Sequence, residues 1–315
     1  MIEAEDTGFT LAEVEGDALL MYRKGDPLPR RILVDQCQRI FDAFHRQLMV
    51  IERDTVCQCG ACQGASGLTL KFVAHYGFIK EIKVDRFTMA TGTEMIIAHR
   101  LMKNDVDAHE YILITEACCE AMDQGDDTSG LVWLKASQAY PSVGAVRYQC
   151  AVLSDFRATI PRPKPRPRFT VVKGEDNLEI KINAPVRDVY QTLINVDKRP
   201  DWLEGVDTIN REVTSERIGM QHNCIFHGFK LVNKSIFADY DPKHARYSEE
   251  VYVVELNLTL LAHYEMVAAD DGGTRLLFNV NWLGSTLPAE GKRGLMAGQA
   301  TNFELLKTAC ETNPA

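Results

Sequence analysis

The chain has 315 residues, 45% of them hydrophobic, and carries a formal net charge of -9. Its length and apolar content predict two folded domains, each with a core of its own. The negative charge argues against a general binder of nucleic acid or of anionic membranes, because neutralising phosphates takes clustered basic residues. No apolar run comes close to the length of about 20 residues that a membrane span needs. The N-terminus also lacks the basic and then apolar order of a signal peptide. We therefore expect a cytoplasmic protein without a membrane span.

The first predicted element is a β-hairpin over residues 11–22. Apolar residues alternate on either side of its Glu-Gly-Asp turn, so we expect Gly16 to adopt a positive φ and Asp17 to lie at the tip. A carboxylate there can bind a divalent metal, but phosphoryl transfer needs a second carboxylate from a neighbouring strand. The alternative interpretation of Asp17 is a solvated acidic turn.

The rest of the first domain alternates helices and strands. Apolar residues at three- and four-residue steps from Leu33 to Ile51 predict a long helix, and a second helix is predicted near Thr93, its expected N-cap. The order of elements predicts an α+β sandwich with helices on one face of an antiparallel sheet. The predicted strands cover residues 67–76 and 79–84, paired as a hairpin, and residues 111–115 and 143–153.

Three segments of this domain resemble the signature segments of class III nucleotide cyclase homology domains. They are the hairpin that ends in Asp17, residues 68–77 and residues 92–101. Residues 51–62 and 99–104 also resemble an uncharacterised bacterial family of cyclase-like proteins. The resemblance covers essentially the whole first domain. It implies a ferredoxin-like fold, in which two aspartates on adjacent strands hold two metals that bind a nucleoside triphosphate.

The resemblance also implies that the catalytic set is degenerate. Asp17 aligns with the second metal-binding aspartate and Arg100 with the phosphate-stabilising arginine, whereas the first aspartate belongs to an opening strand that this sequence does not contain. Glu13 stands where a purine-selecting lysine is usual, and Ile96 stands where the transition-state asparagine would be. Isoleucine can neither donate nor accept that hydrogen bond. We therefore expect Asp17 and Arg100 to be catalytic remnants; the alternative for Arg100 is a simple ion pair with a nearby carboxylate.

The chain has nine cysteines, an odd number, and the sequence shows no secretory signal. Together these features predict free thiols and not a disulfide framework. Cys57, Cys59 and Cys62 lie close together on a glycine-containing loop. Three thiolates at this spacing can hold a zinc ion, with His75 or Cys37 as the fourth ligand if the fold brings one of them near. The alternative is a loop of partly buried thiols.

Alternating prolines over residues 161–168 block helix and central strand and favour an extended spacer. We therefore divide the chain into a first domain at residues 1–157, a Pro/Arg linker at 158–168 and a second domain at 169–315.

The second domain predicts a strand, a helix, an antiparallel meander and a long terminal helix. Pro185 lies in the first turn of the first helix, and the Asp-Asp-Gly-Gly segment at 270–273 makes a hairpin loop. The predicted strands cover residues 177–182, 220–229, 245–254, 259–268 and 274–282, and the terminal helix includes residues 295–310.

This order resembles the helix-grip architecture of START-like and polyketide-cyclase-like proteins. The resemblance implies a curved sheet that wraps the terminal helix and leaves an apolar cavity between them. Strand alternation directs two apolar stripes to one face, and the alternative for each residue is plain core packing. The predicted stripes are Leu260, Ala262, Tyr264 and Met266, and Leu276, Phe278, Val280 and Trp282; the ligand-binding candidates are Tyr264, Met266, Phe278, Val280, Trp282 and, on the helix, Phe303.

The sequence thus predicts an α+β protein, in which a ferredoxin-like cyclase-homology domain precedes a helix-grip START-like domain. We expect a non-catalytic protein whose START-like domain binds a hydrophobic small molecule or lipid and whose cyclase-like domain acts as a regulatory or dimerisation module, giving a homodimer through the first domain. The alternative is a nucleotide cyclase or nucleotide-binding regulator whose missing strand comes from a longer chain or a partner subunit.

Overall fold

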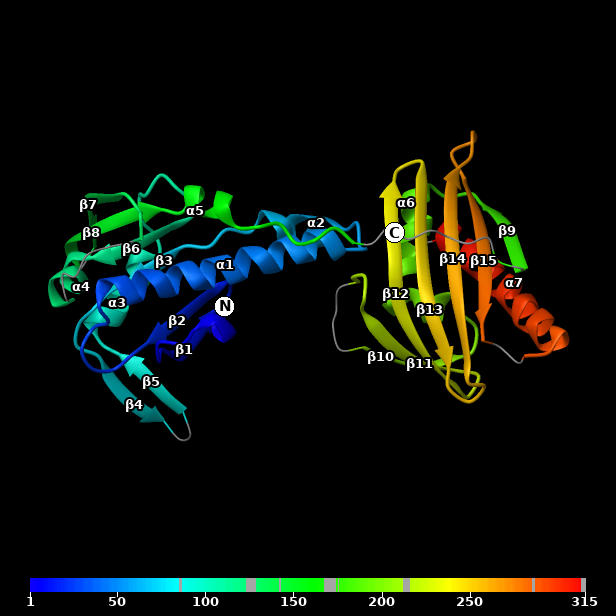
Figure 1. The fold of residues 1–315 in the computed structure, drawn as a ribbon, viewed down its shortest axis with the longest axis horizontal. Helices are drawn as coiled ribbons and strands as arrows, with labels where there is room; N and C mark the ends of the chain where they lie inside the picture. Colours follow the sequence, from blue (N-terminus) through cyan, green and yellow to red (C-terminus); the bar gives the residue numbers. More distant parts are fainter. Residues whose placement is uncertain are drawn as a thin grey trace. The chain divides into compact units, whose positions relative to one another are not determined.

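The computed structural model describes residues 1–84, 87–122, 129–141, 143–166, 174, 176–211, 216–284 and 287–312 (Figure 1). The chain divides into two compact units. Unit 1 comprises residues 1–50 and 67–163, and unit 2 comprises residues 51–66 and 164–315. Residues 167 and 168 of the predicted linker lie outside the described residues. Among the described helices, none combines the length and apolar character of a membrane span.

Unit 1 is built around a four-stranded sheet with the order β3-β6-β8-β7. Its central strand β6 is buried along its whole length and alternates its side chains between two cores. Ile112 and Ile114 pack with helix α1, whereas Tyr111 and Leu113 pack with Leu101 of α3. The elements are β3 (Phe72–Ala74), β6 (Tyr111–Thr115), β7 (Trp133–Tyr140), β8 (Gly144–Val152), α1 (Arg30–Asp54), α3 (Thr93–Leu101), α4 (Glu116–Ala121) and α5 (Ser154–Thr159).

Two features of this sheet differ from the prediction. β3 pairs with β6 in parallel, so the sheet is mixed, and helices cover both faces because β6 is apolar on both. The predicted partner of β3, β4 (Lys80–Val84), instead pairs with β5 (Phe87–Thr91) as a separate hairpin. The charged residues of β4 explain this, since Lys80 and Glu81 are exposed and suit a solvated hairpin better than a buried sheet.

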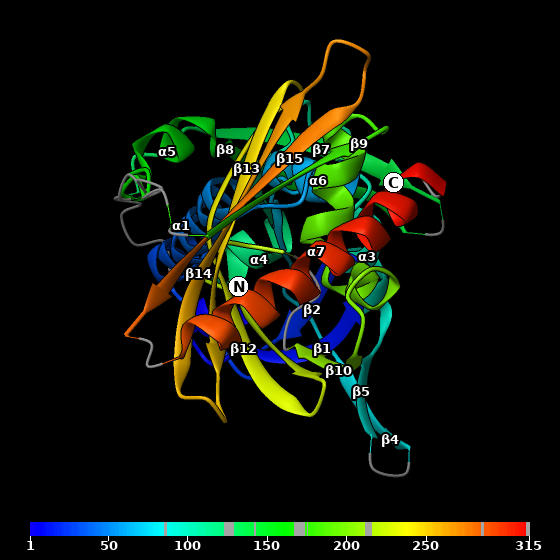
Figure 2. The ribbon, with the colours of Figure 1, turned by 90° about the vertical axis from the view of Figure 1, so that its right-hand side faces the viewer.

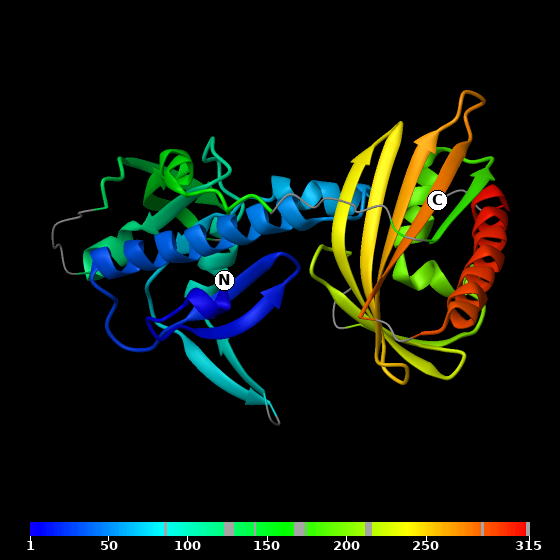
Figure 3. The same ribbon diagram turned by 45° about the vertical axis from the view of Figure 1, so that its right-hand side comes forward.

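The N-terminal hairpin is confirmed. β1 (Thr10–Glu15) pairs with β2 (Ala18–Tyr22), and Gly16 has a φ of 61°. Figure 3 shows this hairpin beside α1, where Gln36 donates a 2.7 Å hydrogen bond to the carbonyl of Ala4 just before it. The second helix also begins as predicted, but its N-cap is Gly92 and not Thr93. Gly92 has a φ of 137°, which a residue with a side chain rarely adopts.

Unit 2 is an antiparallel sheet of seven strands that runs β10-β11-β12-β13-β14-β15-β9. Helices α6 and α7 lie on the same face of this sheet (Figure 2), which we call the inner face. A curved antiparallel sheet closed over a long terminal helix is the helix-grip architecture that the sequence predicts. The elements are β9 (Asp176–Ile182), α6 (Val186–Ile194), η3 (Val196–Asp201), β10 (Val206–Arg211), β11 (Gln221–Phe226), β12 (Phe229–Asp241), β13 (His244–Val253), β14 (Leu258–Ala268), β15 (Thr274–Leu283) and α7 (Ala289–Thr312).

One predicted strand is divided. Residues 220–229 contain β11, a turn at His227 and Gly228, and the start of β12. Both turn residues have positive φ, at 47° and 79°, which matches the tight hairpin turns that join twisted strands. This turn, β10 and most of β12 were not predicted from the sequence.

Candidate functional site

The inner face of unit 2 has an apolar half on β14 and β15. The register pairs Ala262 with Val280, Tyr264 with Phe278 and Met266 with Leu276. Cross-strand partners point to the same side of a sheet, and these side chains form one core with α6 and α7. The predicted shared face is therefore confirmed.

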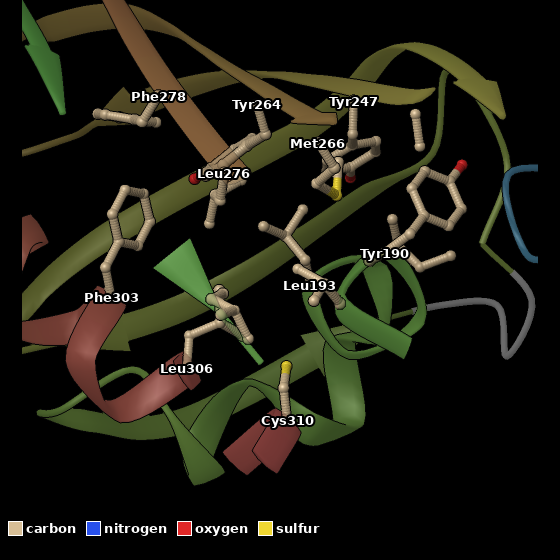
Figure 4. Close-up of a cluster of buried hydrophobic side chains, with 14 of the residues drawn as sticks. Tyr190, Leu193, Tyr247, Tyr264, Met266, Leu276, Phe278, Phe303, Leu306 and Cys310 are labelled. Atoms are coloured by element: carbon tan, nitrogen blue, oxygen red, sulfur yellow. The ribbon is translucent and has the colours of Figure 1, made fainter. Parts of the chain in front are cut away.

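Aromatic rings from the strands meet a ring from α7 at this core (Figure 4). The centroids of Phe278 and Phe303 lie 5.4 Å apart in an edge-on arrangement, and those of Tyr264 and Phe278 lie 5.1 Å apart. Trp282 lies at the margin, where its indole N–H donates a 2.8 Å hydrogen bond to Asp176. These contacts are those of a packed core, and a ligand-binding role for the six candidates stays a prediction.

The other half of the inner face, on β11, β12 and β13, is polar. Strand alternation places these side chains on the same side as Tyr264, which pairs with Tyr247. Their exposed fractions are all 4% or less. A helix-grip core of this kind therefore encloses hydrogen-bonding groups beside its aromatic cluster. The polar half comprises His222, Asn233, Ser235, Tyr247 and Glu249.

A buried ion pair lies at the centre of the polar half. Arg199, from η3, donates to the carboxylate of Glu249, and both side chains are almost completely buried. The hydroxyl of Tyr247 donates to Glu249 Oε1 at 2.7 Å and lies 2.7 Å from Ser235 Oγ. The carboxylate is thus paired with a cation and a phenol, as a buried charge requires.

Electrostatics assign the charges in this network. Burial opposes ionisation of Glu249, but the electrostatic influence of Arg199 and His222 and the hydrogen bonds from Tyr247 and Arg199 outweigh it, so the pKa of Glu249 lies below its usual value. Burial and the neighbouring carboxylate raise the pKa of the Tyr247 phenol well above its usual value. At neutral pH the network therefore holds an ionised carboxylate and a neutral phenol.

Two buried donors of η3 and its C-cap lack a hydrogen-bond acceptor among the described residues: Arg199 Nε and Trp202 Nε1. Both side chains are at least 96% buried, since their exposed fractions are 4% and 3%. An unpaired buried donor costs about 1–3 kcal/mol. The network thus combines a fixed charge pair with one unused donor, Arg199 Nε, which is suited to binding a ligand oxygen.

Sequence reasoning did not find this network. The sequence gives only a weak indication of it. Glu249 lies two residues after Tyr247 in one strand, and side chains two residues apart in a strand point to the same face. Arg199 gave no signal, because η3 brings it to Glu249 across 50 residues of sequence.

The predicted cysteine cluster is present, but in unit 2. The Sγ atoms of Cys57, Cys59 and Cys62 all lie within 4.8 Å of one another, and each residue is half-buried. From the sequence we expected these cysteines in the first domain, whereas their contacts group residues 51–66 with unit 2. The cluster has a composition that can hold a metal.

The three thiols differ in acidity. The backbone N–H of Cys62, which points at Cys59 Sγ, lowers the pKa of Cys59. Burial raises the pKa of Cys57, and burial together with the neighbouring thiols raises that of Cys62 to about 12.

Neither predicted fourth ligand belongs to the cluster. His75 lies in unit 1, where its two ring nitrogens contact Thr115 Oγ1 at 2.8 Å and Glu94 Oε2 at 2.6 Å. Cys37 lies in the apolar core of unit 1, where burial raises its pKa to about 12. Both are committed to unit 1, so a metal at the cluster has three protein ligands among the described residues.

The residues predicted to be catalytic remnants lie on the surface of unit 1. Asp17 and Arg100 are exposed, and neither side chain makes a hydrogen bond or ion pair with a described residue. The expected alternative for Arg100, an ion pair with a nearby carboxylate, is therefore not seen in the described part of the chain. Ile96 is 55% exposed on α3. Glu13 instead groups with Glu15 and His99, whose ligand atoms lie within 4.8 Å of one another.

Comparison with known proteins finds similarity in the N-terminal part of the chain. A family model described as a protein of unknown function, DUF2652, matches residues 1–111. Over 117 residues the chain is 32% identical to the uncharacterized protein Rv2561/Rv2562 of Mycobacterium tuberculosis, covering 37% of this chain and 55% of that protein. The chain thus spans about half the length of this curated relative. The predicted resemblance to an uncharacterised family is confirmed, and its relation to nucleotide cyclases stays a prediction.

Solved structures that are similar to the C-terminal region have low TM-scores and low sequence identities. Hypothetical protein jhp0584 from Helicobacter pylori is 13% identical, with a TM-score of 0.38, and the match covers 42% of this chain and 84% of that chain. Ara h 8.0201 is 14% identical, with a TM-score of 0.37, 44% of this chain and 97% of that chain being covered. The helix-grip assignment of unit 2 accordingly rests on its strand order and helix placement.

Proposed function

We propose that unit 2 binds a hydrophobic small molecule or lipid between its sheet and α7, with the polar half of the inner face contacting the ligand's oxygen. The observation that carries this proposal is the buried pair of Arg199 and Glu249 beside the aromatic cluster. Buried ion pairs contribute little to stability, because replacing both charges with apolar groups is often neutral or stabilising. A charged network inside an apolar core is therefore better explained by recognition of a ligand than by a contribution to the stability of the fold.

The two halves define the chemistry of the ligand. Tyr264, Phe278 and Phe303 suit an apolar body, aromatic or aliphatic. Arg199 Nε suits an acceptor oxygen, such as a hydroxyl, carbonyl or acidic group. The ligand is therefore an amphipathic molecule that carries at least one oxygen.

Two measurements test this proposal on the full-length chain. Small molecules extracted from the native protein are identified by mass spectrometry. In parallel, the protein is titrated with 1-anilinonaphthalene-8-sulfonate, which is anionic, and with N-phenyl-1-naphthylamine, its uncharged analogue. We expect both probes to bind and the anionic probe to bind more tightly.

A charge-free variant separates the two halves. In the double variant Arg199→Met/Glu249→Met, we expect the uncharged probe to keep its affinity and the preference for the anionic probe to fall about tenfold, the worth of one charged hydrogen bond. Leu305→Ala, at a partly exposed position of α7, is the matched control and leaves both affinities unchanged. A protein that carries no extracted small molecule and binds neither probe would contradict the proposal.

For unit 1 we propose a degenerate cyclase-like domain with a ferredoxin-like fold, acting as a regulatory or dimerisation module. Exposed apolar side chains on three of its elements support an association surface: Val14, Ile82 and Ile96 are 59%, 51% and 55% exposed. Sedimentation velocity then detects a homodimer that dissociates in Ile96→Lys. A monomer at all concentrations excludes the dimer.

The second candidate for unit 1 is a nucleotide cyclase or a nucleotide-binding regulator. The exposed Asp17 and Arg100, together with the group of Glu13, Glu15 and His99, favour it. Incubation with ATP or GTP and manganese tests this candidate. Turnover or binding that Asp17→Ala abolishes would establish it in place of a purely structural module.

A further inference from the structure

Cys57 and Cys59 lie on a loop that leads into the short helix α2 (Gly60–Gly64), which carries Cys62. Hydrogen bonds of the backbone anchor the start of this loop within unit 2. Val56 donates to the carbonyl of Glu216 at 3.0 Å, and its own carbonyl accepts a 2.9 Å hydrogen bond from the hydroxyl of Tyr190. Thr55 forms an isolated antiparallel bridge with Arg217, and Ile218 donates to the carbonyl of Asp54 at 2.8 Å. Residues 54–56, directly before the first cysteine, are thus hydrogen-bonded both to residues 216–218 and to Tyr190.

Side chains reinforce this anchoring. Val56 is 1% exposed and belongs to the same core as α6 and α7. Asp54 accepts from Arg166 at 2.8 Å, so the end of α1 is also tied to unit 2. The cysteines therefore follow a rigid support, which lowers the entropic cost of gathering ligands around an ion.

The backbone also arranges the sulfur atoms. The N–H of Cys59 donates to Cys57 Sγ at 3.4 Å, and the N–H of Cys62 donates to Cys59 Sγ at 3.5 Å. Such outer hydrogen bonds orient ligands and stabilise negative charge on sulfur. With all three Sγ atoms within 4.8 Å of one another and half-exposed, an ion can reach them from solvent.

We propose that Cys57, Cys59 and Cys62 form a binding site for one thiophilic closed-shell cation, Zn²⁺ or Cu⁺. Sulfur ligands select these ions over Mg²⁺ and Ca²⁺, which prefer oxygen. The same three sulfurs accommodate Zn²⁺ with solvent as a fourth ligand and Cu⁺ in trigonal coordination. Cys57 packs against the core of unit 2, but the site uses none of the residues proposed to contact the ligand, so this proposal does not depend on that ligand.

The reduced, metal-free full-length chain is titrated first with Co²⁺, a visible substitute for Zn²⁺. We expect one Co²⁺ per chain, with sulfur-to-metal charge-transfer absorption that Zn²⁺ displaces. A separate anaerobic titration uses Cu⁺ against a chromophoric chelator. X-ray absorption distinguishes the two ions by coordination: three sulfurs and one oxygen for Zn²⁺, three sulfurs alone for Cu⁺.

Cysteine variants locate the site. Cys57→Ser, Cys59→Ser and Cys62→Ser should each lose stoichiometric binding and the charge-transfer band. Cys37→Ala and His75→Ala, which change the two residues committed to unit 1, should keep both. At a metal concentration 100 times the dissociation constant, the thermal midpoint of the wild type should rise by about 5–10 °C, and that of Cys59→Ser should not.

Three results would overturn the proposal. The first is a reduced chain that binds neither Zn²⁺ nor Cu⁺ at one ion per chain. The second is binding that survives in Cys59→Ser, because the ion then lies elsewhere. The third is a reduced chain without metal affinity that forms a Cys59–Cys62 disulfide in air, which would make the loop a redox pair.

Discussion

The two halves of the inner face of unit 2 are equally buried but use different forces. On β14 and β15, Tyr264 and Phe278 exclude water by packing against Phe303 of α7. On β11 to β13, burial is accompanied by hydrogen bonds from Arg199 and Tyr247 to Glu249. The apolar half tolerates changes of shape, whereas the polar half requires both members of each pair.

This difference has a functional consequence. A core made only of aromatic and aliphatic side chains sorts ligands by size, because one methylene is worth about 1–3 kcal/mol in a hydrophobic pocket. A site with buried donors discriminates more sharply against molecules that leave those donors unpaired. Under the proposed function, the apolar half supplies affinity and the polar half supplies selectivity.

Removing one charge should give the largest effect on stability. Glu249→Leu leaves Arg199 buried without its carboxylate, and we expect a loss of about 4–5 kcal/mol in the free energy of unfolding. Adding Arg199→Met should restore most of that loss. The matched control is Glu179→Leu, which breaks the exposed 3.4 Å pair with Arg275 and should cost less than about 1 kcal/mol. Chemical denaturation measures all four proteins; equal losses for Glu249→Leu and Glu179→Leu would remove the distinction between the halves.

Truncation in the apolar half should cost somewhat less. Phe303→Ala removes the α7 ring from the aromatic cluster, and we expect a loss of about 3–4 kcal/mol. Leu305→Ala, whose side chain is 37% exposed on the same helix, should cost about 1 kcal/mol or less. The same denaturation series measures both. A small effect of Phe303→Ala would mean that α7 does not close the core.

Acid should affect the polar half selectively. The folded pKa of Glu249 lies below its unfolded value, because the electrostatic influence of Arg199 and His222 and its hydrogen bonds outweigh the cost of burial. The unfolded chain therefore binds the proton first as pH falls, and the stability that Glu249 contributes above its usual pKa of 4.5 is lost below it. In Arg199→Met/Glu249→Met, we expect the free energy of unfolding to fall less steeply as the pH drops into the acid range. Phe303→Ala should keep the steepness of the wild type. Parallel curves for wild type and double variant would contradict this assignment.

Local patterns predicted the apolar half well and the polar half poorly. Alternation in β14 and β15 and the helical spacing of α7 depend on neighbours in sequence, so the shared face of Tyr264 and Phe278 was predictable. The pair of Arg199 and Glu249 depends on a short 3-10 segment meeting a strand 50 residues away. The periodicity of the sequence carries no information about a contact between two such distant segments.

The same limit explains the errors in the fold. The parallel pairing of β3 with β6 joins strands separated by a helix, whereas the sequence favoured the nearer partner, β4. The cysteine loop was placed with its sequence neighbours, but the hydrogen bond from Tyr190 to Val56 links residues 134 positions apart. Cysteine spacing predicted the cluster itself, because that geometry is local.

The smallest expected effect concerns that link between the loop and the core. The ring of Tyr190 belongs to the core of unit 2, and its hydroxyl donates to the carbonyl of Val56. Tyr190→Phe keeps the ring and removes the hydroxyl, so we expect a loss of about 1 kcal/mol, because a buried carbonyl loses its partner. Tyr252→Phe removes an exposed 3.1 Å hydrogen bond to Asn257 and should cost almost nothing. Hydrogen exchange at the amides of residues 55–59 should speed up in Tyr190→Phe alone. Unchanged exchange there would mean that the loop is held by its backbone pairing with residues 216–218 and not by the core.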